Sequence, residues 1–154
     1  MQNKETWAVE QLAILENKTS ALTEKERKAL GADFIAGALQ KVPVKINNQT
    51  ELEIFQSETA QLISQIPLLN TTGRISDPVF SKLLSAYKAS IRKKYKLVAK
   101  GYYMIMWMPL GVAISLSWGV ALGNIALGIP LGIGIGMAIG AGLDRKAEKE
   151  GRVI

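Results

Sequence analysis

The sequence predicts an all-α protein in which a cytoplasmic helical domain precedes a two-span transmembrane helical hairpin. One observation is that no charged residue occurs between Gly101 and Leu143. Another is that apolar residues before this segment recur every three or four positions, as on one face of a helix. We expect four parts: a helical domain (1–76), a basic juxtamembrane helix (77–100), the hairpin (101–143) and a cytoplasmic tail (144–154).

Capping signals place the first helices of the N-terminal domain. A first helix is expected over residues 4–17. A second opens at Thr23, where Glu26 three residues later completes a capping box. This helix should end at Val42, because the residue before a proline avoids the helical region.

A third helix is expected from Thr50, as its cap, until Pro67. The segment 70–73 is interpreted as a turn because it combines asparagine and glycine. Asp77 then caps a fourth helix, with Pro78 at its first position, where a missing N–H costs nothing.

The fourth helix is strongly basic, with seven basic and no acidic residues between 78 and 100. Its basic side chains lie opposite an apolar stripe. Since no helix breaker follows, we expect this helix to continue into the bilayer, with Gly101 as a possible hinge. Its basic face serves either as a solvated topology determinant or as a contact for anionic lipid head groups. The candidate head-group residues are Arg92, Lys93, Lys96 and Lys100.

The apolar segment is long enough for two spans. Residues 101–122 form a helix of about 33 Å, which matches a hydrocarbon core of about 30 Å. Gly123-Asn124 is a turn signal, and residues 125–143 provide the return span. Basic residues flank both spans but not the turn, so both termini are expected on the cytoplasmic side.

Small residues recur at every fourth position of both spans, which predicts close helix packing. The eight candidate packing residues are Gly111, Ser115, Gly119, Gly123, Gly128, Gly132, Gly136 and Gly140. They either join the two spans of one chain or drive oligomerisation. We favour a homo-oligomer, since Gly134 and Gly142 place glycine on a neighbouring face. The lack of ionisable residues in the spans argues against a transporter.

Residues 125–152 carry a run of alternating glycines (Gly-Ile-Gly-Ile-Gly-Met-Ala-Ile-Gly-Ala-Gly-Leu-Asp) followed by a charged tail. This stretch resembles the C-terminus of small bacterial glycine-zipper membrane proteins. The resemblance implies a bacterial inner-membrane setting and no particular activity.

Composition excludes several kinds of chemistry. The chain has no cysteine and no histidine, so thiol chemistry and the commonest metal ligands are missing. We predict no enzyme: no catalytic, cofactor-binding or metal site, and no cofactor. The basic residues gather in one short segment, which argues against nucleic-acid binding.

The expected function is therefore a membrane-anchored, non-enzymatic interaction or scaffold protein that self-associates. Its expected partners are membrane lipid and further copies of itself, and a cytoplasmic protein is a further candidate. The alternative is an oligomeric pore-forming or membrane-disrupting effector controlled by the cytoplasmic domain.

Overall fold

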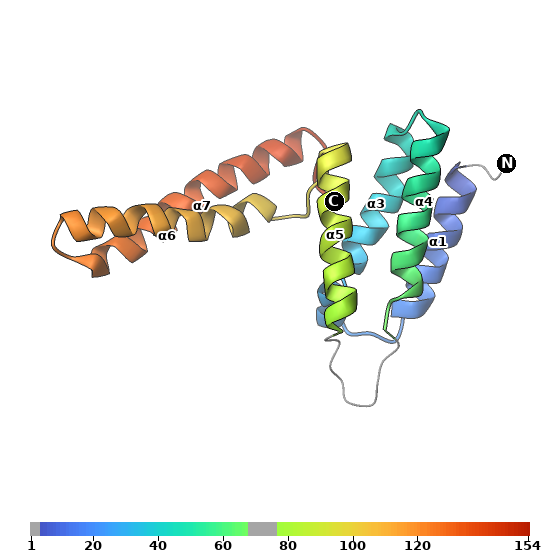
Figure 1. Cartoon of the computed structure of the whole chain (residues 1–154), viewed down its shortest axis with the longest axis horizontal. Coiled ribbons are helices and arrows are strands. Elements are labelled where there is room, and N and C mark those ends of the chain that lie inside the picture. The colour runs from blue at the N-terminus through green and yellow to red at the C-terminus, as the bar shows by residue number, and fades with distance from the viewer. Residues whose placement is uncertain (1–3, 68–76) are drawn as a thin grey trace. The chain divides into compact units, whose positions relative to one another are not determined.

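The computed structural model describes residues 4–67 and 77–154, and it divides the chain into two compact units. The first contains the chain up to Lys96 together with Ile154, and the second runs from Leu97 to Val153. The predicted all-α class is confirmed for the described residues, whereas the expected turn at 70–73 lies outside them. The first unit contains α1 (Lys4–Thr19), α2 (Glu24–Ala29), α3 (Ala32–Lys45), α4 (Gln49–Ser64) and α5 (Pro78–Tyr95) (Figure 1).

The core of the first unit lies where the apolar faces of α1, α3, α4 and α5 meet. Trp7 and Phe55 contact edge to face with ring centroids 6.0 Å apart, and Phe55 contacts Tyr95 in the same way at 6.3 Å. Ile35 and Leu39 of α3 are fully buried as well. Burial of these aromatic and aliphatic side chains supplies the main driving force for folding of this unit.

Two lysine side chains of α1 cap the C-terminal ends of α3 and α4. Lys4 Nζ donates to the carbonyl of Ile46 at 2.7 Å, just beyond α3. Lys18 Nζ donates to the carbonyl of Ile63 at 2.9 Å, in the last turn of α4. A cation near unpaired carbonyls satisfies them and complements the helix dipole. The helix α1 extends to Thr19, slightly beyond the expected end at residue 17.

The capping box that starts α2 is confirmed, but the helix is shorter than expected. The Glu26 carboxylate accepts the Thr23 N–H at 2.8 Å. The chain then leaves the helix at Gly31, whose φ of 66° is left-handed, and α3 begins at the next residue. Glycine adopts this conformation without a Cβ penalty. The single helix predicted from Thr23 is therefore wrong, because Gly31 divides it in two.

Further helix boundaries differ from their expected positions, including the end of α4, which is Ser64 and lies before the expected stop at Pro67. The expected stop at Val42 is wrong, since α3 continues through Pro43 and both residues are buried. Val42 is therefore helical although it precedes a proline. The N-cap of α4 is Asn48, whose Oδ1 accepts the Thr50 N–H at 3.0 Å, so Thr50 lies inside the helix.

The helix α5 starts as predicted but does not continue into the apolar segment. Asp77 Oδ1 accepts the Val79 N–H at 2.8 Å. The helix ends at Tyr95, and Lys96 is left-handed with φ 59°. Beyond it the Val98 N–H donates to the Arg152 carbonyl at 2.9 Å, which an α-helix would not permit. The expected continuous helix is therefore wrong, because the chain is extended here.

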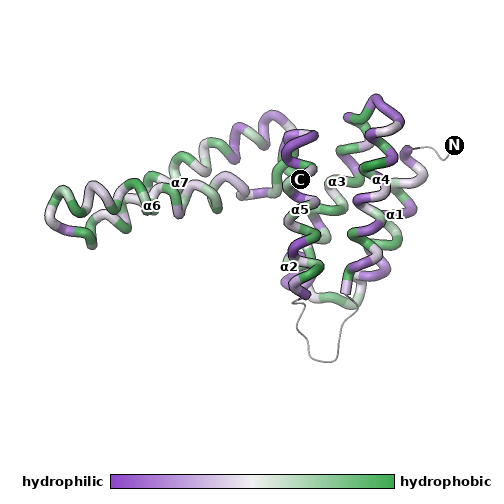
Figure 2. The backbone as a smooth tube through the Cα atoms, viewed as in Figure 1, coloured by the Kyte–Doolittle hydropathy of each residue, from purple (hydrophilic) through white to green (hydrophobic). Residues whose placement is uncertain are grey.

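The second unit consists mainly of two apolar helices, α6 (Tyr102–Ala121) and α7 (Ile125–Lys149). The chain reverses at Gly123, whose φ is 70°, and Asn124 caps α7 by accepting the Ala126 N–H at 3.1 Å. The two helices pack side by side and antiparallel (Figure 1). Figure 2 shows that their residues are mostly hydrophobic and that the C-terminal end of α7 is hydrophilic.

Candidate functional site

The packing interface between α6 and α7 gathers seven of the eight predicted small residues. On α6 these are Gly111, Ser115 and Gly119, and on α7 they are Gly128, Gly132, Gly136 and Gly140; all seven are buried. The eighth, Gly123, is exposed and provides the left-handed turn between the helices. It therefore belongs to the turn and not to the interface. The period of four is broken because the chain leaves the helix there.

The two backbones approach so closely that side chains would not fit between them. A methyl group at Gly140 would lie 2.5 Å from Met104 Cα, and one at Gly136 would lie 2.8 Å from Met108 Cα. Carbon atoms in proteins do not approach that closely without bonding, and backbone atoms cannot swing aside as a side chain would. Glycine at these positions is thus required by the short distance between the helices.

The interface is less tight near the turn. A methyl group at Gly119 would lie 3.1 Å from Ile125 Cα, a contact that a small shift could relieve. Gly134 and Gly142 have no atom of the described chain within 4 Å of such a group. These two glycines therefore take no part in the α6–α7 interface and lie on an open face of α7.

Ser115 supplies the polar contact in the middle of this interface. Its hydroxyl donates to the Gly128 carbonyl at 2.6 Å, and the Val112 carbonyl lies 3.2 Å away. The side chain is only 2% exposed, so an unpaired hydroxyl would be costly. Ser115 therefore joins the helices by a hydrogen bond and satisfies its own polar group.

A carboxylate from α7 closes the start of α6, and sequence reasoning missed it. The Tyr103 and Met104 N–H groups donate to the two oxygens of Asp144, each at 3.0 Å. The N-cap of α6 is Gly101, which is left-handed and offers no side-chain acceptor. Asp144 therefore acts as a cap supplied by another helix. One available signal was that Asp144 is the first charged residue after the apolar run.

The segment after α7 lies against the segment before α6. Val98 forms an isolated parallel bridge with Val153, next to its hydrogen bond with Arg152. The Arg152 guanidinium pairs with the Glu150 carboxylate and donates to the Tyr103 hydroxyl at 3.4 Å. Together with Asp144, these contacts hold the start of α6 against the end of α7.

The four predicted head-group residues are divided between the two units. Arg92 and Lys93 lie in the last turn of α5, and Lys96 is its left-handed C-cap, so all three belong to the first unit. Lys100 alone belongs to the unit that contains α6 and α7. All four side chains are exposed.

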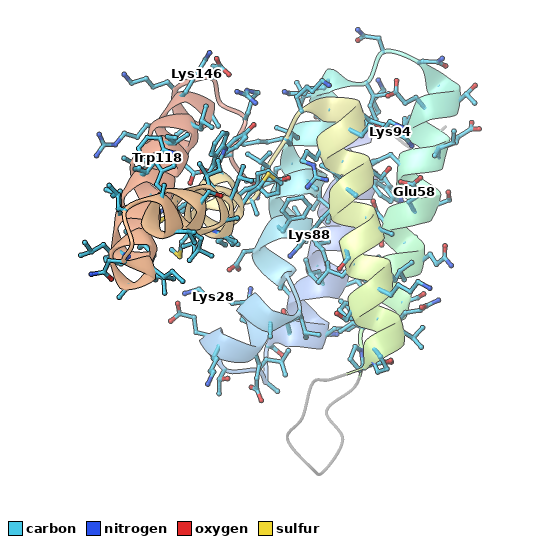
Figure 3. The ribbon with its side chains drawn as sticks, turned by 60° about the vertical axis from the view of Figure 1, so that its left-hand side comes forward. Lys28, Glu58, Lys88, Lys94, Trp118 and Lys146 are labelled. Atoms are coloured by element: carbon cyan, nitrogen blue, oxygen red, sulfur yellow. The ribbon has the colours of Figure 1, made fainter. Side chains whose placement is uncertain are left out.

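The first unit carries a groove of about 290 Å³ between α4 and α5. It is lined by Glu58, Gln61, Leu83, Ala86, Tyr87 and Ser90. Lys94 Nζ lies 3.4 Å from the Glu58 carboxylate, and both residues are labelled in Figure 3. In the described part of the chain no three carboxylates come together as a metal site would require.

The described chain thus belongs to the class of all-helical proteins with two helices long and apolar enough to cross a membrane. No protein-family model matches it, and no curated protein or solved structure matches it significantly.

Proposed function

We propose that the protein is a non-enzymatic membrane scaffold whose α6–α7 pair crosses the bacterial inner membrane as a hairpin, with both termini in the cytoplasm. The observation that carries this proposal is the exposure of the two apolar helices. Only 17% of the apolar window of α6 and 22% of that of α7 is buried within the chain. The core helix of a water-soluble protein would be mostly covered.

Individual side chains support the same conclusion. Ile105 is 73% exposed on α6 and Leu122 is 71% exposed at its end. Exposing apolar surface of this kind to water raises the free energy of the protein, whereas exposing it to hydrocarbon does not. With 20 residues, α6 is about 30 Å long, the thickness of the hydrocarbon core.

Self-association is the proposed role of the hairpin. The α6–α7 interface uses one small-residue face of α7 and leaves Gly134 and Gly142 open. Small residues on a membrane helix permit the close approach of another helix. The N-terminal unit, which carries the α4–α5 groove, would then be available to a cytoplasmic protein partner.

Membrane extraction and topology mapping test the anchoring. The full chain should stay with membranes washed at alkaline pH, and tags at both termini should be digested by protease only after the cells are opened. Release by the alkaline wash would contradict the proposal, and digestion in intact spheroplasts would contradict the orientation. Rapid dye release from liposomes containing the purified protein would instead favour the pore-forming or membrane-disrupting effector.

A further inference from the structure

We propose that the hydrophilic end of the α6–α7 pair binds the head groups of anionic phospholipids. We call this cluster the basic collar; it consists of Lys100, Arg145, Lys146 and Lys149. The proposal rests on the membrane anchoring proposed above. Of the four head-group residues expected from the sequence, it keeps only Lys100.

The three collar residues of α7 share its outer face. At about 100° per residue, Arg145, Lys146 and Lys149 lie within about 100° of one another around the helix. The buried residues Gly140 and Ala147 lie on the opposite side, against the rest of the unit. All three basic side chains are exposed, and Figure 3 shows Lys146 at the end of α7.

Lys100 lies at the same end of the helix pair. It precedes α6 by two residues, and the amides of Tyr103 and Met104 are bonded to Asp144 of α7. On its other side, the Val98 N–H donates to the Arg152 carbonyl. The backbone around Lys100 is thus attached to the end of α7 on both sides. Backbone hydrogen bonds therefore fix the position of Lys100 at the end of the helix pair that carries the basic residues of α7.

Most of the nearby acidic charge is already compensated. Asp144 accepts two amides at the positive end of α6, and Glu150 pairs with Arg152. Glu148 is the remaining acid of the tail, and it is exposed. None of the four collar residues forms an ion pair with the part of the chain that the structure describes. Their charge is free to attract an anion.

The position of the collar selects the lipid phosphate as the anion. The cluster lies where the apolar helices end, which is the depth of the head groups once the pair is embedded. Tyr102 and Tyr103 lie at the same end, as aromatic residues do at a membrane interface. A zwitterionic lipid carries no net charge, whereas each Lys or Arg near an anionic surface strengthens binding by about fivefold.

The test titrates the full chain in neutral detergent with short-chain phosphatidylglycerol or phosphatidylcholine, and counts bound lipid by native mass spectrometry. The collar variant is Arg145→Gln, Lys146→Gln and Lys149→Gln together. The matched control is Arg92→Gln, Lys93→Gln and Lys96→Gln on the first unit, which removes the same net charge. Circular dichroism verifies that both variants are folded.

We expect wild type to prefer phosphatidylglycerol by more than tenfold, the collar variant to lose at least tenfold of its affinity for it, and the control to keep it. Equal losses in the two variants, or a loss confined to the control, would overturn the assignment. Displacement of the lipid by millimolar inorganic phosphate would show a free-anion site and overturn it as well.

A parallel alkaline wash of membranes separates this inference from the proposed function. If wild type is released by the wash, the anchoring itself fails. If it is retained but shows no preference for phosphatidylglycerol, only the basic collar fails.

Discussion

Asp144 of α7 accepts the backbone N–H of Tyr103 through one oxygen at 3.0 Å, and thereby caps a helix that starts 42 residues earlier at Tyr102. Its other oxygen accepts the next amide along the chain. The carboxylate thus ties the start of α6 to the C-terminal part of α7.

Replacing Asp144 with alanine should destabilise the α6–α7 unit by about 1–2 kcal/mol, because two helix-terminal amides lose their acceptor. Asp144→Asn should cost less, since its amide oxygen still accepts one bond. The measurement is thermal unfolding in detergent, followed by circular dichroism. Glu148→Gln is the control, and an equal effect from it would contradict the capping role.

Gly140→Ala should lower the stability of the helix pair by about 2 kcal/mol or more, because the methyl group would meet Met104 Cα at 2.5 Å. Gly142→Ala, two residues away on the open face, should leave stability unchanged or slightly raised. Unfolding curves of the two variants in the same detergent provide the comparison. Similar melting temperatures would show that the close approach at Gly140 does not exist.

Gly134→Leu should reduce the oligomeric mass of the protein in nanodiscs while leaving the α6–α7 pair intact, because Gly134 is open on the surface of one chain. Gly136→Leu is the contrasting variant, because its side chain would force α6 and α7 of the same chain apart. Mass photometry and circular dichroism together distinguish the two effects. A monomeric wild type, or an unchanged mass of Gly134→Leu, would refute association through this face.

Alkaline pH should destabilise the N-terminal unit through Tyr87. Burial raises the pKa of this phenol, outweighing the hydrogen bond that it shares with Thr59 at 2.9 Å. Because the pKa in the folded state is above the unfolded value of about 10, the folded state holds the proton more tightly. The stability contributed by Tyr87 is therefore complete below about pH 10 and is lost as pH rises beyond it.

The check on this prediction is chemical unfolding of the full chain between pH 8 and 11, with and without Tyr87→Phe. The variant should be less stable at pH 8, because Thr59 loses a partner, but its stability should fall less steeply above pH 10. Parallel pH profiles would show that another group is responsible for the alkaline loss.

Local patterns were sufficient where one short segment carries both the signal and its partner. Thr23 with Glu26, and Asp77 before Pro78, start helices as predicted because the capping bonds span two or three residues. The two apolar helices were also predictable, because length and the lack of charge are properties of the segment alone.

Features that depend on distant partners were not predictable in this way. The helix α5 ends at Tyr95, and the Val98 amide beyond it is bonded to Arg152, more than fifty positions away. Likewise, the glycine spacing treated Gly123 as equivalent to Gly119, although only Gly119 faces the other helix.

The sequence alone therefore determined which segments are apolar, where several helices start, and which residues are small enough for a close interface. Only the tertiary structure decided that Gly136 and Gly140 meet backbone while Gly134 and Gly142 remain open, and that Asp144 caps α6. The physical reason is that periodicity specifies a face of a helix, whereas the contacts of that face depend on where the chain reverses and which distant groups complete its hydrogen bonds.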